Sequence, residues 1–109
     1  MDTNPNARLS IVAYKAKPGK EAELMSLVGE HVPYLRSVGL ATERPQVIAT
    51  ANDGTVVEVF EWAEGGLAKA HAHPGVGELW TRFSAACDFV PLKTLEEAGM
   101  MFANFVPVN

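Results

Sequence analysis

The stretch EWAEGGLAKAHAHPGVGELW, residues 61–80, decides the fold of this chain. It contains the end of a strand at Glu61 and Trp62, a double glycine, a short helical segment with two histidines, and then a proline. Pro74 ends the first helix and suits the first position of a second helix, where its missing N–H costs no hydrogen bond. The stretch therefore predicts a strand followed by a broken helix, which is typical of a small α+β protein.

Two longer helices are predicted on either side of this stretch, because apolar residues recur there at spacings of three and four. Between residues 20 and 38 these residues are Leu24, Val28, Leu35 and Val38, and His31 lies within their stripe. After Pro74 they are Val76, Leu79, Trp80, Phe83, Ala86 and Cys87. This period places one face of each helix against a core. We also expect Pro33 to kink the first helix.

Four strands are predicted from runs of apolar residues at 9–14, 46–50, 55–62 and 100–106. The turn sequence Asn52-Asp53-Gly54 joins the middle two strands as an antiparallel hairpin. A short helix is expected at residues 94–98. The resulting order, β-α-β-β-α-β, predicts a ferredoxin-like α+β fold with a four-stranded antiparallel sheet and both helices on one face. The other face is also apolar, so we expect a second copy of the chain to cover it.

Composition restricts the class of protein. The 109 residues correspond to one domain, residues 1–109. The net charge of −4, without a basic cluster, disfavours nucleic acid and anionic membrane as partners. Cys87 is the single cysteine, which excludes an intrachain disulfide and fits a reducing compartment. The polar start MDTNPNARLS has no apolar signal-peptide core, so a cytoplasmic location is expected.

With these elements in this order, the chain resembles the antibiotic biosynthesis monooxygenase-like family of dimeric α/β-barrel proteins. The segments that carry the resemblance are KAKPGKEAEL (15–24), VVEVFEW (56–62) and HAHPGVGELW (71–80), in that order. The resemblance implies a homodimer in which two sheets pack face to face, with a pocket between sheet and helices in each subunit. It also implies, for some members, oxygenation of polyphenolic compounds without a bound cofactor.

The haem-degrading branch of this family is disfavoured. That branch combines a strand-end tryptophan with an asparagine on the first strand and a histidine on the second helix. Trp62 matches the tryptophan, but the first strand, LSIVAYK, has no asparagine, and the matching part of the second helix, from Glu78 to Trp80, has no histidine.

His71 and His31 are the candidate catalytic residues. Imidazole exchanges protons near neutral pH, and cofactor-free oxygenation requires a base that turns the substrate into an electron-rich anion. A histidine that only hydrogen-bonds nearby groups is the alternative. Metal binding by His71 and His73 is a further possibility, although neighbours two apart on a helix point to different faces and a third ligand, from His31, Glu58 or Glu61, is needed.

Aromatic and polar residues on the strands and the second helix are candidate contacts for a flat ligand. They are Trp62, Tyr14, Glu58, Phe60 and Trp80. Aromatic side chains at these spacings also serve packing, and a carboxylate such as Glu58 is either at a sheet edge or paired. The sequence thus leaves three functions open: a cofactor-free monooxygenase, a non-catalytic binding or stress-related module of the same fold, and a metal-binding protein.

Overall fold

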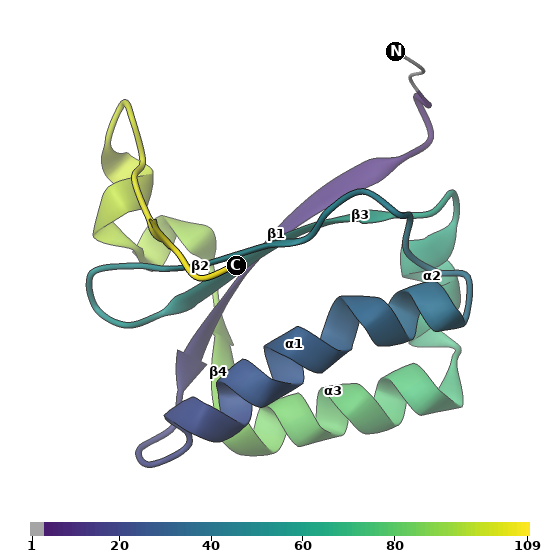
Figure 1. The fold of residues 1–109 in the computed structure, drawn as a ribbon, viewed down its shortest axis with the longest axis horizontal. Helices are drawn as coiled ribbons and strands as arrows, with labels where there is room; N and C mark the ends of the chain where they lie inside the picture. Colours follow the sequence, from purple (N-terminus) through teal and green to yellow (C-terminus); the bar gives the residue numbers. More distant parts are fainter. Residues whose placement is uncertain (1–3) are drawn as a thin grey trace.

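The structure, a computed structural model, describes residues 4–109 and shows an α+β domain with a five-stranded antiparallel sheet and three helices (Figure 1). Two short 3-10 turns, Leu92–Thr94 and Glu96–Gly99, precede the last strand. The helices and strands are β1 (Arg8–Ala16), α1 (Glu21–Ser37), β2 (Val47–Thr50), β3 (Val56–Trp62), α2 (Gly66–His71), α3 (Pro74–Ala86), β4 (Cys87–Val90) and β5 (Val106–Pro107).

The sheet has the strand order β4-β1-β3-β2-β5, so β1 and β3 lie at its centre. Along this central pair Ser10 is opposite Phe60, Val12 is opposite Glu58, and Tyr14 is opposite Val56. Side chains two residues apart on a strand share a face. Ser10, Val12 and Tyr14 therefore lie on the same side of the sheet as Glu58 and Phe60.

Helices α1 and α3 cover that side of the sheet (Figure 1). The predicted stripe on α1 is buried, from Leu24 to Leu35, and His31 is buried within it. The helix continues through Pro33 to Ser37. Burial of this stripe and of the matching face of α3 forms the core and fixes His31 above the sheet. Within residues 4–109, no helix combines the length and the apolar character needed to cross a bilayer.

The broken helix is present, but the two histidines do not share it. His71 is the last residue of α2, whereas His73 is extended and caps the N-terminus of α3. The ring Nδ1 of His73 accepts a hydrogen bond from the backbone N–H of Val76 at 3.2 Å. The residue before a proline is pushed out of the helical region, which explains this geometry at His73.

The prediction for the end of the chain was wrong. The strand beside β1 is β4, Cys87–Val90, and not residues 100–106, which contribute only the first residue of the two-residue strand β5. Cys87 therefore belongs to a strand and not to the preceding helix: its backbone is extended, while its Sγ still contacts the Phe83 carbonyl oxygen at 3.1 Å. The expected helix at 94–98 is replaced by the two 3-10 turns.

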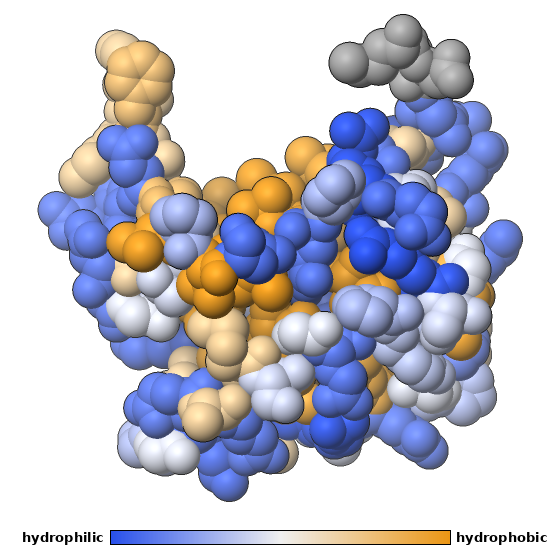
Figure 2. Space-filling view, viewed as in Figure 1, coloured by the Kyte–Doolittle hydropathy of each residue, from blue (hydrophilic) through white to orange (hydrophobic). Residues whose placement is uncertain are grey.

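The far side of the sheet is covered only in part. The C-terminal segment, residues 91–105, folds over one end of it and packs Leu95 against Ala13 and Val57 (Figure 1). The other end leaves apolar side chains in solvent, with Ile11 50% exposed and Val47 47% exposed. Figure 2 shows apolar residues gathered in a hollow on this side.

Candidate functional site

A cavity of about 310 Å³ lies between the sheet and the helices. Its volume is at the lower end of the range of about 300–1,000 Å³ that is usual for small-molecule sites. Most of its wall is aromatic, and its polar atoms come from a few side chains. The lining residues are Ser10, Val12, Tyr14, His31, Phe60, Trp62, Leu67, His71, Trp80, Phe83 and Phe89.

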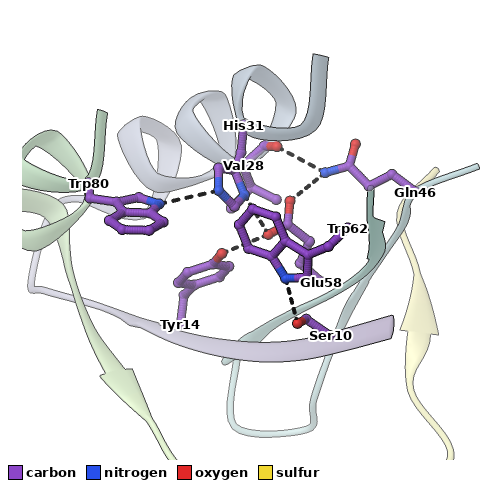
Figure 3. Close-up of polar contacts among 8 residues, drawn as sticks. All are labelled: Ser10, Tyr14, Val28, His31, Gln46, Glu58, Trp62 and Trp80. Carbon is purple, nitrogen blue, oxygen red and sulfur yellow. Dashed lines mark hydrogen bonds and ion pairs between the residues drawn. The ribbon is translucent and has the colours of Figure 1, made fainter. Parts of the chain in front are cut away.

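Glu58 is a fully buried carboxylate beside this cavity, with 0% of its surface exposed. Its Oε1 accepts a hydrogen bond from the Tyr14 hydroxyl at 2.6 Å and lies 2.9 Å from Nδ1 of His31 (Figure 3). Its Oε2 accepts from the side-chain amide of Gln46, which also donates to the carbonyl of Val28. A buried carboxylate is costly unless its oxygens are paired, and these three donors supply the pairing.

His31 is held in one orientation between Glu58 and Trp80. Its Nδ1 faces the carboxylate, and its Nε2 lies 3.5 Å from the indole Nε1 of Trp80 (Figure 3). The carboxylate only accepts and the indole N–H only donates, so a neutral His31 carries its proton on Nδ1 and its lone pair on Nε2. A contact of 3.5 Å is at the weak limit of hydrogen bonding. The lone pair of Nε2 therefore accepts at most a weak hydrogen bond, from Trp80.

Aromatic rings fix the plane of the His31 imidazole. Phe60 and Phe83 contact it edge to face, with ring centroids 5.3 Å and 5.2 Å away. Only 3% of the His31 surface is exposed. Packing of this kind restricts the ring rotation that would move its lone pair away from a ligand.

Tyr14 is a permanent donor in this group. Burial, followed by the charge of Glu58 and the hydrogen bond to it, raises the pKa of the Tyr14 hydroxyl far above its usual value. The phenol therefore stays protonated and keeps donating to Glu58. Its ring stacks on Phe83 with centroids 5.1 Å apart.

Trp62 and Ser10 form a second polar contact in the cavity wall. The indole Nε1 of Trp62 donates to the Ser10 hydroxyl oxygen at 2.8 Å (Figure 3). The Trp62 ring is buried and contacts Phe60 at a centroid distance of 4.9 Å. Ser10 precedes Tyr14 by four residues on β1, so the two polar groups are separated along the strand by about 13 Å.

His71 lies at the rim of the cavity. It is exposed, and its ring contacts Trp80 at a centroid distance of 5.2 Å. His73 is outside the cavity lining and is used as a helix cap. Among residues 4–109, no three histidine, cysteine, aspartate or glutamate side chains lie close enough together to hold a metal ion.

The residues singled out from the sequence lie around one cavity. Six of them line it: His31, His71, Tyr14, Phe60, Trp62 and Trp80. Glu58 lies beside it and is hydrogen-bonded to Tyr14 and His31. Sequence reasoning missed Ser10 and Gln46. Ser10 could have been found, because it shares a strand face with Tyr14, but Gln46 precedes β2 without any distinguishing pattern.

Comparison with protein-family models, with curated proteins and with solved structures gave no match to this chain. The resemblance to the dimeric-barrel monooxygenase-like family stays a prediction. A functional proposal for the cavity therefore has to come from its own geometry and chemistry.

Proposed function

We propose that the protein binds a small aromatic compound in the cavity and removes a proton from it with His31. The observation that carries the proposal is the arrangement of this one histidine: Nδ1 is 2.9 Å from a buried carboxylate, while Nε2 points toward Trp80, which lines the same aromatic-walled cavity. A carboxylate behind an imidazole fixes its tautomer and stabilises the imidazolium that forms when Nε2 takes a proton.

The ligand that fits the cavity is flat and carries no full charge before it reacts. Over residues 4–109, no lysine, arginine, aspartate or glutamate lines the cavity, so a carboxylate or phosphate group on the ligand would find no counter-charge there. The indoles of Trp62 and Trp80 and the nearby phenylalanines offer ring faces and edges to a ligand. A phenol or an enolisable aromatic ketone of one or two rings has the size and the acidic hydrogen that this site needs.

The reaction that suits this site is oxygenation without a bound cofactor, as the resemblance implies. Proton removal by His31 gives an electron-rich anion, which can reduce molecular oxygen. For an activated CH₂ group beside the ring, one oxygen atom becomes a carbonyl in the product, and the other leaves as water with the two substrate hydrogens. His71 at the rim and Trp62 in the wall would then shape access and binding, with Tyr14, Phe60 and Trp80.

Oxygen uptake with a panel of polyphenols and aromatic ketones of one or two rings with an activated CH₂ group tests this function. We expect uptake by the wild type and a loss of about 10²–10⁴-fold in His31→Gln, the range associated with a general base. Glutamine can still donate to Glu58 but cannot take the proton. His73→Asn is the matched control, because asparagine is also a good helix cap and His73 does not line the cavity. An uptake rate that is the same in His31→Gln and the wild type would contradict the role of His31.

A non-catalytic binding module is the second candidate. Both nitrogens of His31 and both oxygens of Glu58 already have partners within the protein, as in a network that only stabilises a fold. Binding of phenols without any oxygen uptake across the panel would favour this alternative.

We also propose that the fold is the ferredoxin-like one and that two copies associate through the far side of the sheet. The strand order β4-β1-β3-β2, with α1 and α3 on one side, supports the first part. The exposed Leu9, Ile11 and Val47 on the sheet, with Met101 and Phe102 on the C-terminal segment, support the second. An apolar surface of this extent on a soluble chain is typical of an interface.

A further inference from the structure

The cavity has a second polar group that the proton transfer at His31 does not use. Ser10 lines the cavity on β1 and is half-buried. Its backbone pairs with Phe60, whereas Val12, two residues further on, pairs with Glu58. Two residues of a strand span about 7 Å, so the backbone of Ser10 lies about 7 Å along the strand from the position opposite Glu58. This distance is close to the length of one substituted aromatic ring.

The hydrogen bond from Trp62 decides what Ser10 can still do. An indole N–H can only donate, so the 2.8 Å contact engages a lone pair of the serine oxygen. Within residues 4–109, the structure shows no acceptor for the hydroxyl hydrogen of Ser10. A hydroxyl in this state is free to donate its own hydrogen bond, and a ligand in the cavity that Ser10 lines would supply the acceptor.

The cavity therefore presents opposite requirements to the two ends of a ligand. Nε2 of His31, which has a weak contact with the Trp80 indole, can accept a hydrogen, whereas the Ser10 hydroxyl offers one. The stretch between them is walled by the rings of Phe60 and Trp62 and by Val12. A ligand with a carbonyl at the Ser10 end meets these requirements better than a ligand with a hydroxyl at that end.

We propose that Ser10 is a specificity-determining residue that donates a hydrogen bond to a carbonyl oxygen of the ligand. The site then selects aromatic compounds with an acidic hydroxyl at the His31 end and a carbonyl at the Ser10 end. This inference rests on the proposed function, because it takes His31 as the group that meets the acidic end. A carbonyl conjugated with the ring also disperses the negative charge that proton removal creates, so the same contact assists that step.

Two probes of nearly equal shape test the inference. They are 4′-hydroxyacetophenone, which has a carbonyl opposite its hydroxyl, and 4-ethylphenol, which has a CH₂ group in its place. Binding is followed by the fluorescence of Trp62 and Trp80, both of which line the cavity. One added hydrogen bond should make the wild type bind the ketone more tightly by about 2- to 12-fold.

Variants of Ser10 isolate the contact. Ser10→Thr keeps the hydroxyl and should keep the full preference for the ketone. Ser10→Ala should lose the part of that preference that the hydrogen bond supplies and keep only the part that comes from the greater acidity of the ketone's hydroxyl. If the alanine variant does not fold, Ser10→Cys serves in its place, because a thiol of nearly the same shape is only a weak donor. Trp62→Phe removes the indole N–H, so the serine oxygen can also accept a hydrogen bond from a ligand. This variant should therefore discriminate less between a ligand with a carbonyl at the Ser10 end and one with a second hydroxyl there.

The outcomes separate this inference from the proposed function. Equal affinities of the wild type for the two probes, or a preference for the ketone that is undiminished in Ser10→Ala or Ser10→Cys, would overturn the role of Ser10 and leave the cavity as a phenol site. If neither probe binds to the wild type, the phenol site itself is wrong and the role of Ser10 is lost with it.

Discussion

At the scale of single residues, Glu58 determines the state of the groups around it. It holds Tyr14, His31 and Gln46 in place through hydrogen bonds, although none of its own surface reaches solvent. A charge in this position is tolerated only because each oxygen has a donor. The same pairing fixes the proton of a neutral His31 on Nδ1 and leaves the lone pair on Nε2, the nitrogen that the proposed proton transfer uses.

Replacing Glu58 by Gln should therefore destabilise the protein, because the amide NH₂ of Gln cannot accept the bonds that one of the carboxylate oxygens accepts. We expect a loss of about 2–4 kcal/mol in the free energy of unfolding, in the range for breaking a buried charged network. Urea denaturation measures it. The matched control is Glu61→Gln on the same strand, where the half-buried carboxylate pairs with the exposed Arg44 and accepts from Thr42. The amide oxygen of Gln can still accept from Thr42, so the unfolding midpoint should move much less. Equal effects of the two substitutions would contradict the buried network.

The importance of His31 and Glu58 could be suspected from the sequence, but their pairing could not. His31 stands out as a polar residue within the apolar stripe of α1, and Glu58 as a carboxylate between the apolar residues of β3. Their contact joins residues 27 apart in the chain and depends on how α1 crosses the sheet. Local periodicity fixes which face a side chain is on, and carries no information on which partner it meets there.

At the scale of the elements, the double glycine after β3 sets the approach of α2 to the sheet. Gly65 has a φ of 73°, a left-handed conformation that favours glycine. A Cβ on Gly66 would collide with the backbone carbonyl oxygen of Leu40 and would contact the ring of Trp62. The close approach of α2 thus holds His71 at the rim of the cavity and the Trp62 ring in its wall.

Gly66→Ala should destabilise the protein by about 1–3 kcal/mol, because the added methyl group forces backbone apart. Gly77→Ala in α3 is the control, since a Cβ there meets no atom within 4 Å. Alanine favours a helix interior over glycine by about 0.5–1 kcal/mol, so this variant should be slightly more stable than the wild type. Thermal unfolding of both variants measures whether each substitution lowers or raises the stability. A stabilising Gly66→Ala would contradict the packing of α2 described here.

The elements themselves were predictable where the spacing of apolar residues was regular, as in α1, β3 and α3. The assignment failed after Ala86, because Cys87 continues the helical spacing although its backbone is already extended. Residues 100–106 looked like a strand because they are apolar, yet Met101 is 94% exposed and the segment reaches only the edge of β2. An apolar segment that packs on another surface has the same composition as one that is buried in a sheet.

At the scale of the whole molecule, the two sides of the sheet differ in the surface that they present. The cavity with His31 lies on the helix side, and the incompletely covered apolar surface lies on the other. The hollow seen in Figure 2 lies between the C-terminal segment and the N-terminal end of β1. Association through that surface would leave the cavity open on the helix side, so each copy could act independently.

Sedimentation of the wild type at micromolar concentration should show a dimer, and Ile11→Lys should shift it to the monomer. A lysine in the centre of the apolar surface would have to be buried without a counter-charge. Ala68→Lys on α2 is the control with the same change of charge at an exposed position, and it should remain a dimer. A wild type that sediments as a monomer would contradict the proposed association.

The most direct test of the central claim, proton removal by His31 from a ligand in the cavity, is the absorption spectrum of bound 4-nitrophenol. At slightly acidic pH most of the free compound is the colourless phenol, and the anion is yellow. We predict that saturating wild-type protein produces the yellow band, and that His31→Gln binds the compound but leaves it colourless. A bound compound that stays colourless in the wild type, or that turns equally yellow in His31→Gln, would contradict the claim.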